Sequence, residues 1–106
     1  MTYQAYVHEM HASMERMMRD MHAPPASGDP DADFLAMMIP HHQGAVDMAK
    51  LVLVHGRDPL VRALAEEIIA GQTTEIAAMQ ARLGRLKRGG DADPDGFPAL
   101  GSTRGR

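Results

Sequence analysis

Residues 29–60 read DPDADFLAMMIPHHQGAVDMAKLVLVHGRDPL and enclose one expected helix between two pairs of start signals. Asp29 can cap a helix whose first residue is Pro30. An aspartate side chain accepts a hydrogen bond from one of the free backbone N–H groups in the first turn. Proline suits the first helical position because it has no N–H that would be left unpaired there. Asp58 and Pro59 repeat this arrangement. The stretch therefore predicts one helix that ends just before a second helix begins.

The rest of the chain predicts an all-α fold in a single domain. Apolar residues recur at steps of three and four, which indicates helices at about 2–22, 30–55 and 58–87. Because the connections are short, we expect an antiparallel, up-down-up helical bundle over residues 1–87. The Gly/Pro-rich residues 88–106 are expected to form a flexible tail. Three helices leave an apolar edge that a dimer would cover, although the sequence does not require one.

The composition excludes several classes of function. The chain has 106 residues, no cysteine and a net charge of -3, so we expect no disulfide, catalytic thiol or nucleic-acid surface. No apolar stretch approaches the ~20 residues that span a membrane. The first residues lack a signal peptide, which predicts a cytoplasmic protein or a trimmed form of an exported one. The unusual feature is ten methionines together with six histidines.

Counting residues outward from the two expected turns predicts that many of these side chains share one zone. At about 1.5 Å per residue, the second turn puts His42 level with Gly71. The first turn puts His41 level with His11. The zone so defined contains His11, Met14, Met37, Met38, His41, His42, Gln72 and Glu75, with Met18 and Met79 at its edge.

This set of side chains has the chemistry of a copper site. Thioether sulfur and neutral imidazole suit Cu(I), for which Ag(I) is a mimic, whereas carboxylates and water suit harder ions. Met37 with His41, and Met38 with His42, are spaced four apart and can each share an ion with a facing helix. The expected metal ligands are His11, Met14, Met18, Met37, Met38, His41, His42, Met48 and Met79, and the residues expected to orient the imidazoles are Gln72 and Glu75.

A packing interpretation stays open for the same residues. Methionine is a flexible core filler, so the regular spacing of Met10, Met17 and Met21 is first of all that of a packing seam. His42 can equally be a core histidine that is hydrogen-bonded to Glu75. The copper interpretation therefore depends on whether sulfur and imidazole groups meet in the fold.

Three backbone positions are expected to shape the zone. Pro40 removes one helical hydrogen bond, which kinks a helix and would set how the histidine pair is presented. Alternatively, the helix restarts at Pro40. Gly44 and Gly71 would let the second and third helices approach closely, despite costing about 1 kcal/mol each in helix propensity.

Two longer motifs resemble a known family. FLAMMIPHHQGAVDMA at residues 34–49, followed by LAEEIIAGQTTEIAAMQARL at residues 64–83, resembles the domain of unknown function family 305. The family pattern is Met-Ile-x-His-His, a downstream Asp-Met-Ala, and a later Ile-x-x-x-Gln-x-x-Glu-Ile-x-x-Met. The resemblance implies a ferritin-like helical bundle that is exported, often periplasmic, binds copper through Met and His, and is linked to copper tolerance. The matching motif positions are Met38, His41, His42, Met48, Gln72, Glu75 and Met79.

We therefore expect a non-enzymatic protein that holds Cu(I) in its bundle core and buffers, stores or hands on copper. Its partners would be the metal ion, a second copy in the dimer, and a copper donor or acceptor that the sequence does not identify. One alternative is a structural or oligomerising module whose His and Met are simply core. A second is a metal-dependent oxidase, which is disfavoured because the sequence shows no substrate-handling residues.

Overall fold

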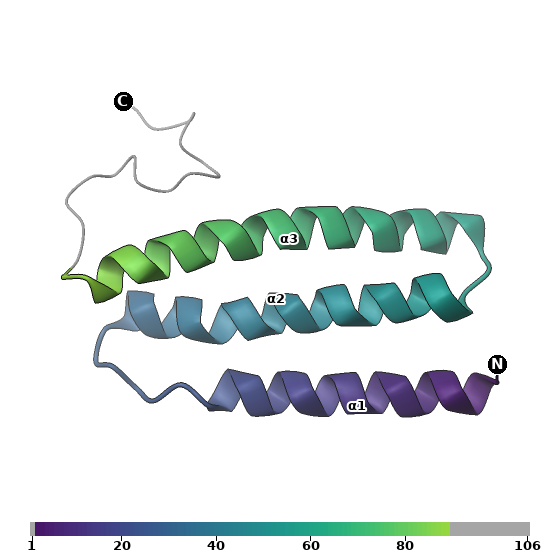
Figure 1. The fold of residues 1–106 in the computed structure, drawn as a ribbon, viewed down its shortest axis with the longest axis horizontal. Coiled ribbons are helices and arrows are strands. Elements are labelled where there is room, and N and C mark those ends of the chain that lie inside the picture. The colour runs from purple at the N-terminus through teal and green to yellow at the C-terminus, as the bar shows by residue number, and fades with distance from the viewer. Residues whose placement is uncertain (1, 90–106) are drawn as a thin grey trace.

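The computed structural model describes residues 2–89, which form three α-helices (Figure 1). The helices are α1 (Tyr3–His22), α2 (Pro30–His55) and α3 (Pro59–Lys87). No strand occurs between residues 2 and 89, and the all-α prediction is confirmed. Within this same stretch, none of the helices has the length and apolar character needed to cross a membrane. From residue 90 onwards, the expected tail lies outside the described residues.

Local cap chemistry sets where α2 and α3 begin, as the sequence predicts. The Asp29 side chain accepts a hydrogen bond of 3.0 Å from the backbone N–H of Asp31. The Asp58 side chain accepts one of 2.9 Å from the backbone N–H of Val61. Each aspartate satisfies a backbone donor that the first turn of a helix leaves free.

The three helices lie side by side in one layer, with α2 between α1 and α3 (Figure 1). Neighbouring helices are antiparallel, as predicted. The Cα positions span 51 × 32 × 14 Å. Because α2 packs extensively against both neighbours whereas α1 and α3 meet only weakly, the layer is one helix thick. Among residues 2–89, no further helix covers either face of the layer.

The two connections differ in length, and this difference sets how the helices align. Residues 56–58 form a tight turn between α2 and α3. Residues 23–29 are a longer connection, and α2 begins well beyond the end of α1 (Figure 1). As a result, α1 lies alongside the C-terminal part of α2, where Met17 packs against Gly44.

The buried residues lie in two narrow helix–helix interfaces, one on each side of α2. Ser13 of α1 and Gly44 of α2 are buried where these two helices meet. On the other side, the buried positions of α2 and α3 include Leu35, His42, Val46, Ala49, Ala65, Ile76 and Met79. No large side chain within residues 2–89 is fully buried. The layer therefore has interhelical contacts but no enclosed core.

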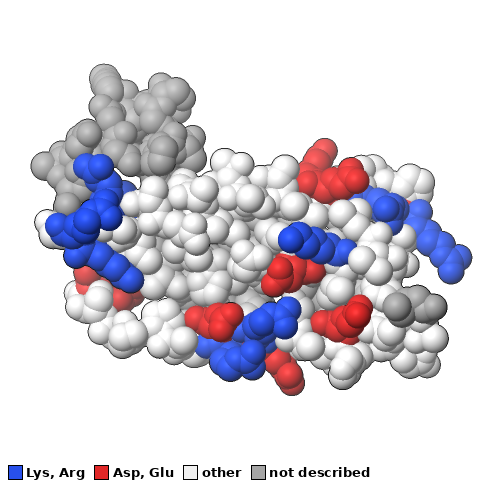
Figure 2. Space-filling view, in the orientation of Figure 1, with Lys and Arg blue, Asp and Glu red and all other residues white. Residues whose placement is uncertain are grey.

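The two faces of the layer differ in character. The face seen in Figure 2 carries Lys, Arg, Asp and Glu side chains over all three helices. Arg16 and Asp47 form an ion pair of 3.9 Å that joins α1 to α2. Helical periodicity places a set of large exposed apolar side chains on the face opposite this ion pair. They are Tyr3, Met14, Met18, Phe34, Val61, Leu64 and Ile68.

Pro40 does not restart the helix. α2 is continuous from Pro30 to His55, and Pro40 lies inside it. Proline has no N–H, so the carbonyl one turn earlier loses its helical partner while the neighbouring hydrogen bonds keep the helix intact. The histidine pair is thus presented by one unbroken helix.

The predicted role of the two glycines is wrong. Gly44 faces α1 rather than α3, and a Cβ atom at this position would lie 2.6 Å from the Cγ of Met17 and closer still to its Sδ. Gly71 is exposed, and a Cβ atom there would meet nothing within 4 Å. Close approach at Gly44 therefore joins α1 to α2, and Gly71 does not bring α3 closer to α2.

The Gly44 contact gives a test of the alignment of α1. Gly44→Ala is expected to lower the free energy of unfolding by about 1–2 kcal/mol, because overpacking costs about 1–3 kcal/mol and outweighs the roughly 1 kcal/mol that Ala gains over Gly in a helix. Urea unfolding at one protein concentration measures the change. Adding Met17→Ala should recover part of the loss, since it removes the clashing side chain. An unchanged or raised stability of Gly44→Ala would contradict the contact.

Candidate metal centre

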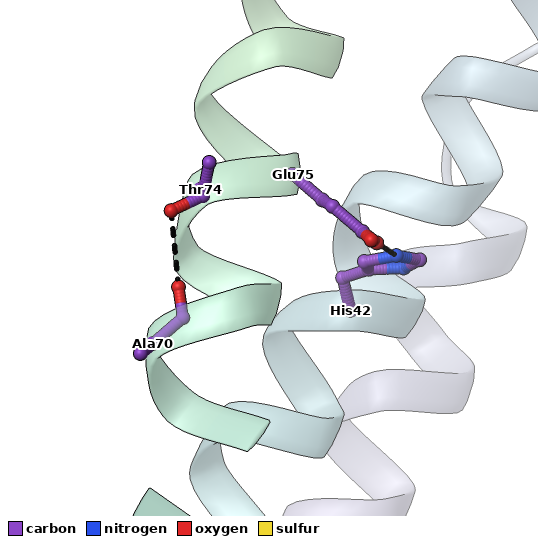
Figure 3. A network of polar contacts seen from close by, with 4 residues as sticks. All are labelled: His42, Ala70, Thr74 and Glu75. Carbon is purple, nitrogen blue, oxygen red and sulfur yellow. Dashed lines mark hydrogen bonds and ion pairs between the residues drawn. The ribbon is translucent and has the colours of Figure 1, made fainter. Parts of the chain in front are cut away.

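A hydrogen bond between His42 and Glu75 links α2 to α3 (Figure 3). The Nε2 atom of His42 lies 2.6 Å from the Oε1 atom of Glu75. The His42 side chain is 11% exposed, whereas that of Glu75 is 62% exposed. Thr74, the residue before Glu75, turns its hydroxyl back to the carbonyl of Ala70 in its own helix. Glu75 is thus the residue in this view that reaches across to the imidazole.

The antiparallel arrangement explains why these two residues meet. Side chains in a helix lean toward its N-terminus, so residues on antiparallel helices lean in opposite directions. Counting from the turn at residues 56–58 puts His42 level with Gln72, and Glu75 one turn further along. His42 and Glu75 lean toward each other and close that gap. The expected level of His42 is therefore correct to within one turn, and the partner is Glu75.

The second ring nitrogen of His42 and the hydroxyl of Ser13 are the two buried side-chain polar atoms without a hydrogen-bond partner in the described part of the chain. In His42 this atom is Nδ1. Because a carboxylate oxygen accepts hydrogen bonds, the Nε2 atom that faces Glu75 carries the ring proton. In a neutral imidazole the Nδ1 atom then has a free lone pair. A histidine that donates one N–H to a carboxylate and offers its other nitrogen is the usual arrangement of a metal-ligating histidine.

Two methionines lie one turn from this pair. Met38 precedes His42 by four residues, and Met79 follows Glu75 by four, so in antiparallel helices both methionines lie at the same end of the contact. Met79 is buried and Met38 is half-buried. We call His42, Glu75, Met38 and Met79 the α2–α3 seam. It combines one free imidazole nitrogen with two thioether sulfurs.

His41 lies beside this seam but has a different environment. Its ring centroid is 6.0 Å from that of His42, and its side chain is exposed. The contact of Met17 with Gly44 puts His41 level with residue 20 of α1, next to Met21. Nothing in the sequence distinguishes Met21 from Met10 and Met17, because the length of the first connection does not reveal its path.

The expected alignment of α1 is wrong. Counting from a tight first turn put His11 level with His41, but the structure puts His11 near Lys50, about nine residues or roughly 14 Å further along α2. Met14 lies level with Asp47. The long connection causes the error, because it lets α2 begin beyond the end of α1. The structure does not bring His11 or Met14 to the α2–α3 seam.

The other expected ligands lie around the seam rather than in it. Met18 and Met37 are exposed, and Met48 is half-buried near the level of Met14. Gln72 is half-buried. Between residues 2 and 89, no three His, Asp or Glu side chains gather as a metal-binding group. The seam itself holds one histidine and one carboxylate, so any further donor there would be the sulfur of Met38 or Met79.

A second histidine–carboxylate pair lies at the other end of the layer. The Nε2 atom of His55 is 2.7 Å from the Oε1 atom of Glu9, and the ring packs edge-on against Tyr6. The rings of His55 and Tyr6 help to line a cleft of about 600 Å³. This pair joins α1 to α2 and supports the same alignment as Met17 and Gly44.

The fold and the site define an antiparallel three-helix protein with a histidine–carboxylate pair flanked by thioethers. The chain belongs to the family described as Domain of unknown function (DUF305), whose model matches residues 2–86. This finding confirms the family resemblance.

One relative is Uncharacterized protein L153 of Acanthamoeba polyphaga mimivirus. The two chains are 39% identical over 57 residues, which is 54% of this chain and 38% of the relative. The chain therefore matches little more than a third of that protein's length.

The state of the His42 ring can be tested directly. ¹⁵N NMR spectra are expected to show the ring with its proton on Nε2, because Glu75 accepts from that atom. Glu75→Ala should let the ring exchange between both neutral forms. His55 is the matched control, since its carboxylate partner is Glu9, and it should not respond to Glu75→Ala. A proton found on Nδ1 of His42 in the unaltered protein would exclude the proposed free lone pair.

Proposed function

We propose that the protein binds Cu(I) at the α2–α3 seam and buffers, stores or hands on copper without catalysing a reaction. The observation that carries this proposal is the buried Nδ1 atom of His42, which has no hydrogen-bond partner. Leaving a buried polar atom unpaired costs about 1–3 kcal/mol. A bound metal ion would give this atom a partner, so the position has a physical reason to hold histidine.

The identity of the ion follows from the donors. Met38 and Met79 provide thioether sulfur on either side of the seam, and thioether with imidazole suits Cu(I) rather than Mg²⁺, Ca²⁺ or Mn²⁺. Glu75 would accept from the Nε2–H of His42 and make the ring a better donor to the ion. Ag(I), which has similar softness, would serve as a mimic.

The wider role is proposed from the family resemblance. The chain would act in the periplasm or another exported location in copper tolerance, exchanging copper with a donor or acceptor protein. Its helices would form part of a ferritin-like bundle that is completed by dimerisation. The open layer supports this view, because a domain ordinarily packs two layers around its core.

Competition against a Cu(I) chelator under anaerobic conditions tests the copper site. His42→Ala should remove the tight site, and Met38→Leu or Met79→Leu should weaken binding by at least about tenfold, because each loses one donor. Leucine is close to methionine in volume, so these variants should keep their helices. Met10→Leu is the matched control outside the seam and should bind as the unaltered protein does.

Two results would contradict the proposal. Binding no tighter than micromolar, or binding that His42→Ala leaves unchanged, would favour a structural module whose His and Met are only core. Catalytic oxidation of Cu(I) by oxygen that His42→Ala abolishes would instead favour the oxidase. Circular dichroism of each variant confirms that a loss of binding is not a loss of fold.

A further inference from the structure

The cleft of about 600 Å³ beside His55 lies at one end of the helical layer, where parts of all three helices come together. The N-terminal end of α1 and the turn between α2 and α3 both lie at this end (Figure 1). His55 follows His42 by roughly 20 Å of helix, so the cleft is separate from the α2–α3 seam. Besides His55, its walls include Tyr3, Tyr6, Val52, Val61 and, from the turn, Arg57.

Much of the wall of this cleft is aromatic or aliphatic. The ring centroids of Tyr3 and Tyr6 are 6.0 Å apart, and Tyr6 packs edge-on against His55. Tyr3 is 75% exposed and Val61 is 48% exposed, so both keep apolar surface that a ligand can cover. Clefts of roughly 300–1,000 Å³ with apolar walls and a few polar groups are typical of small-molecule sites.

Arg57 brings to the cleft a positive charge that has no partner. Within residues 2–89, its side chain makes no hydrogen bond or ion pair. The acidic groups around the cleft are already engaged. Glu9 is held by His55 at 2.7 Å, and the side chain of Asp58 accepts from the backbone N–H of Val61 at 2.9 Å.

The usual structural role of a basic residue after a helix is filled by Arg62. Basic side chains near the end of a helix commonly donate to its last carbonyl groups. The guanidinium of Arg62 donates to the carbonyls of Leu53 and Gly56, at 2.7 and 3.0 Å. Arg57 is therefore available to an anion that enters the cleft.

We propose that this cleft binds a small molecule that has an apolar body and one carboxylate. The body lies against the tyrosine rings and the valines, and the carboxylate pairs with the guanidinium of Arg57, whose planar fork matches a carboxylate in shape and charge. Because the walls come from all three helices, the ligand joins α1 to α3, which otherwise meet only weakly. The site does not depend on the proposed copper site.

Tyrosine fluorescence of the full chain tests the cleft directly. Both tyrosines of the chain line the cleft, and the chain has no tryptophan. Octanoate and 3-phenylpropionate are each expected to change this fluorescence with a saturable curve, and the acid that binds more tightly identifies the body as aliphatic or aromatic. The matched alcohols, octan-1-ol and 3-phenylpropan-1-ol, should bind about threefold to fivefold more weakly, because they lack the ion pair with an exposed arginine.

Two variants, each with a matched control, separate the parts of the site. Arg57→Gln should weaken both acids by the same factor and leave the alcohols unchanged, whereas Lys50→Gln removes a positive charge elsewhere and should bind as the unaltered protein does. Val61→Glu places a carboxylate on the wall and should also weaken both acids, since like charges repel. Leu64→Glu makes the same change outside the cleft, at a side chain that is 51% exposed, and should have no effect.

Three results would overturn the proposal. The first is that neither acid changes the fluorescence at millimolar concentration. The second is that acids and alcohols bind equally well, and the third is that Lys50→Gln weakens the acids as much as Arg57→Gln does. If Val61→Glu does not fold, Arg57→Gln still decides, because its side chain is exposed and holds no other group. His42→Ala should bind the acids normally, so the cleft and the copper site can fail separately.

Discussion

The central position of α2 is the constraint on which the rest of the structure depends. α1 and α3 both pack on α2, so this helix must be apolar on two opposite sides while its neighbours bury only one side each. Small residues such as Gly44 and Ala49 are buried on it and let both neighbours approach. Because the layer is one helix thick, each helix–helix interface is narrow. A single residue in such an interface therefore has a large effect on its polarity and packing.

His42 and Glu75 show what this constraint does to stability. An interface made only of aliphatic residues would hold α2 and α3 together without a buried unpaired nitrogen. The structure instead places an imidazole there and orients it with one carboxylate. Positions where a fold departs from the most stabilising choice are typical of functional sites. The polar pair is thus better explained by the free nitrogen that it creates than by its contribution to packing.

The helices themselves are predictable from the sequence because their start signals are local. Asp29 with Pro30 and Asp58 with Pro59 set the starts of α2 and α3 within a few residues of chain. The α2–α3 alignment is also predictable to about one turn, because three residues leave little freedom. The alignment of α1 is not, since seven residues can follow many paths. For this reason counting from the first turn places His11 beside His41, whereas the Met17–Gly44 contact puts the C-terminal end of α1 at that level.

The order of the helices in the layer is the same as their order in the chain, and this has a consequence for cooperativity. Each helix packs mainly against its neighbours in sequence, and α1 and α3 meet only weakly, which resembles a repeat protein whose stability is a sum of single units and nearest-neighbour interfaces. α1 and α3 are therefore coupled mainly through α2. Within a single chain, fraying of α1 would leave the paired histidine and glutamate in place, so the layer can loosen at one edge while the other keeps its form.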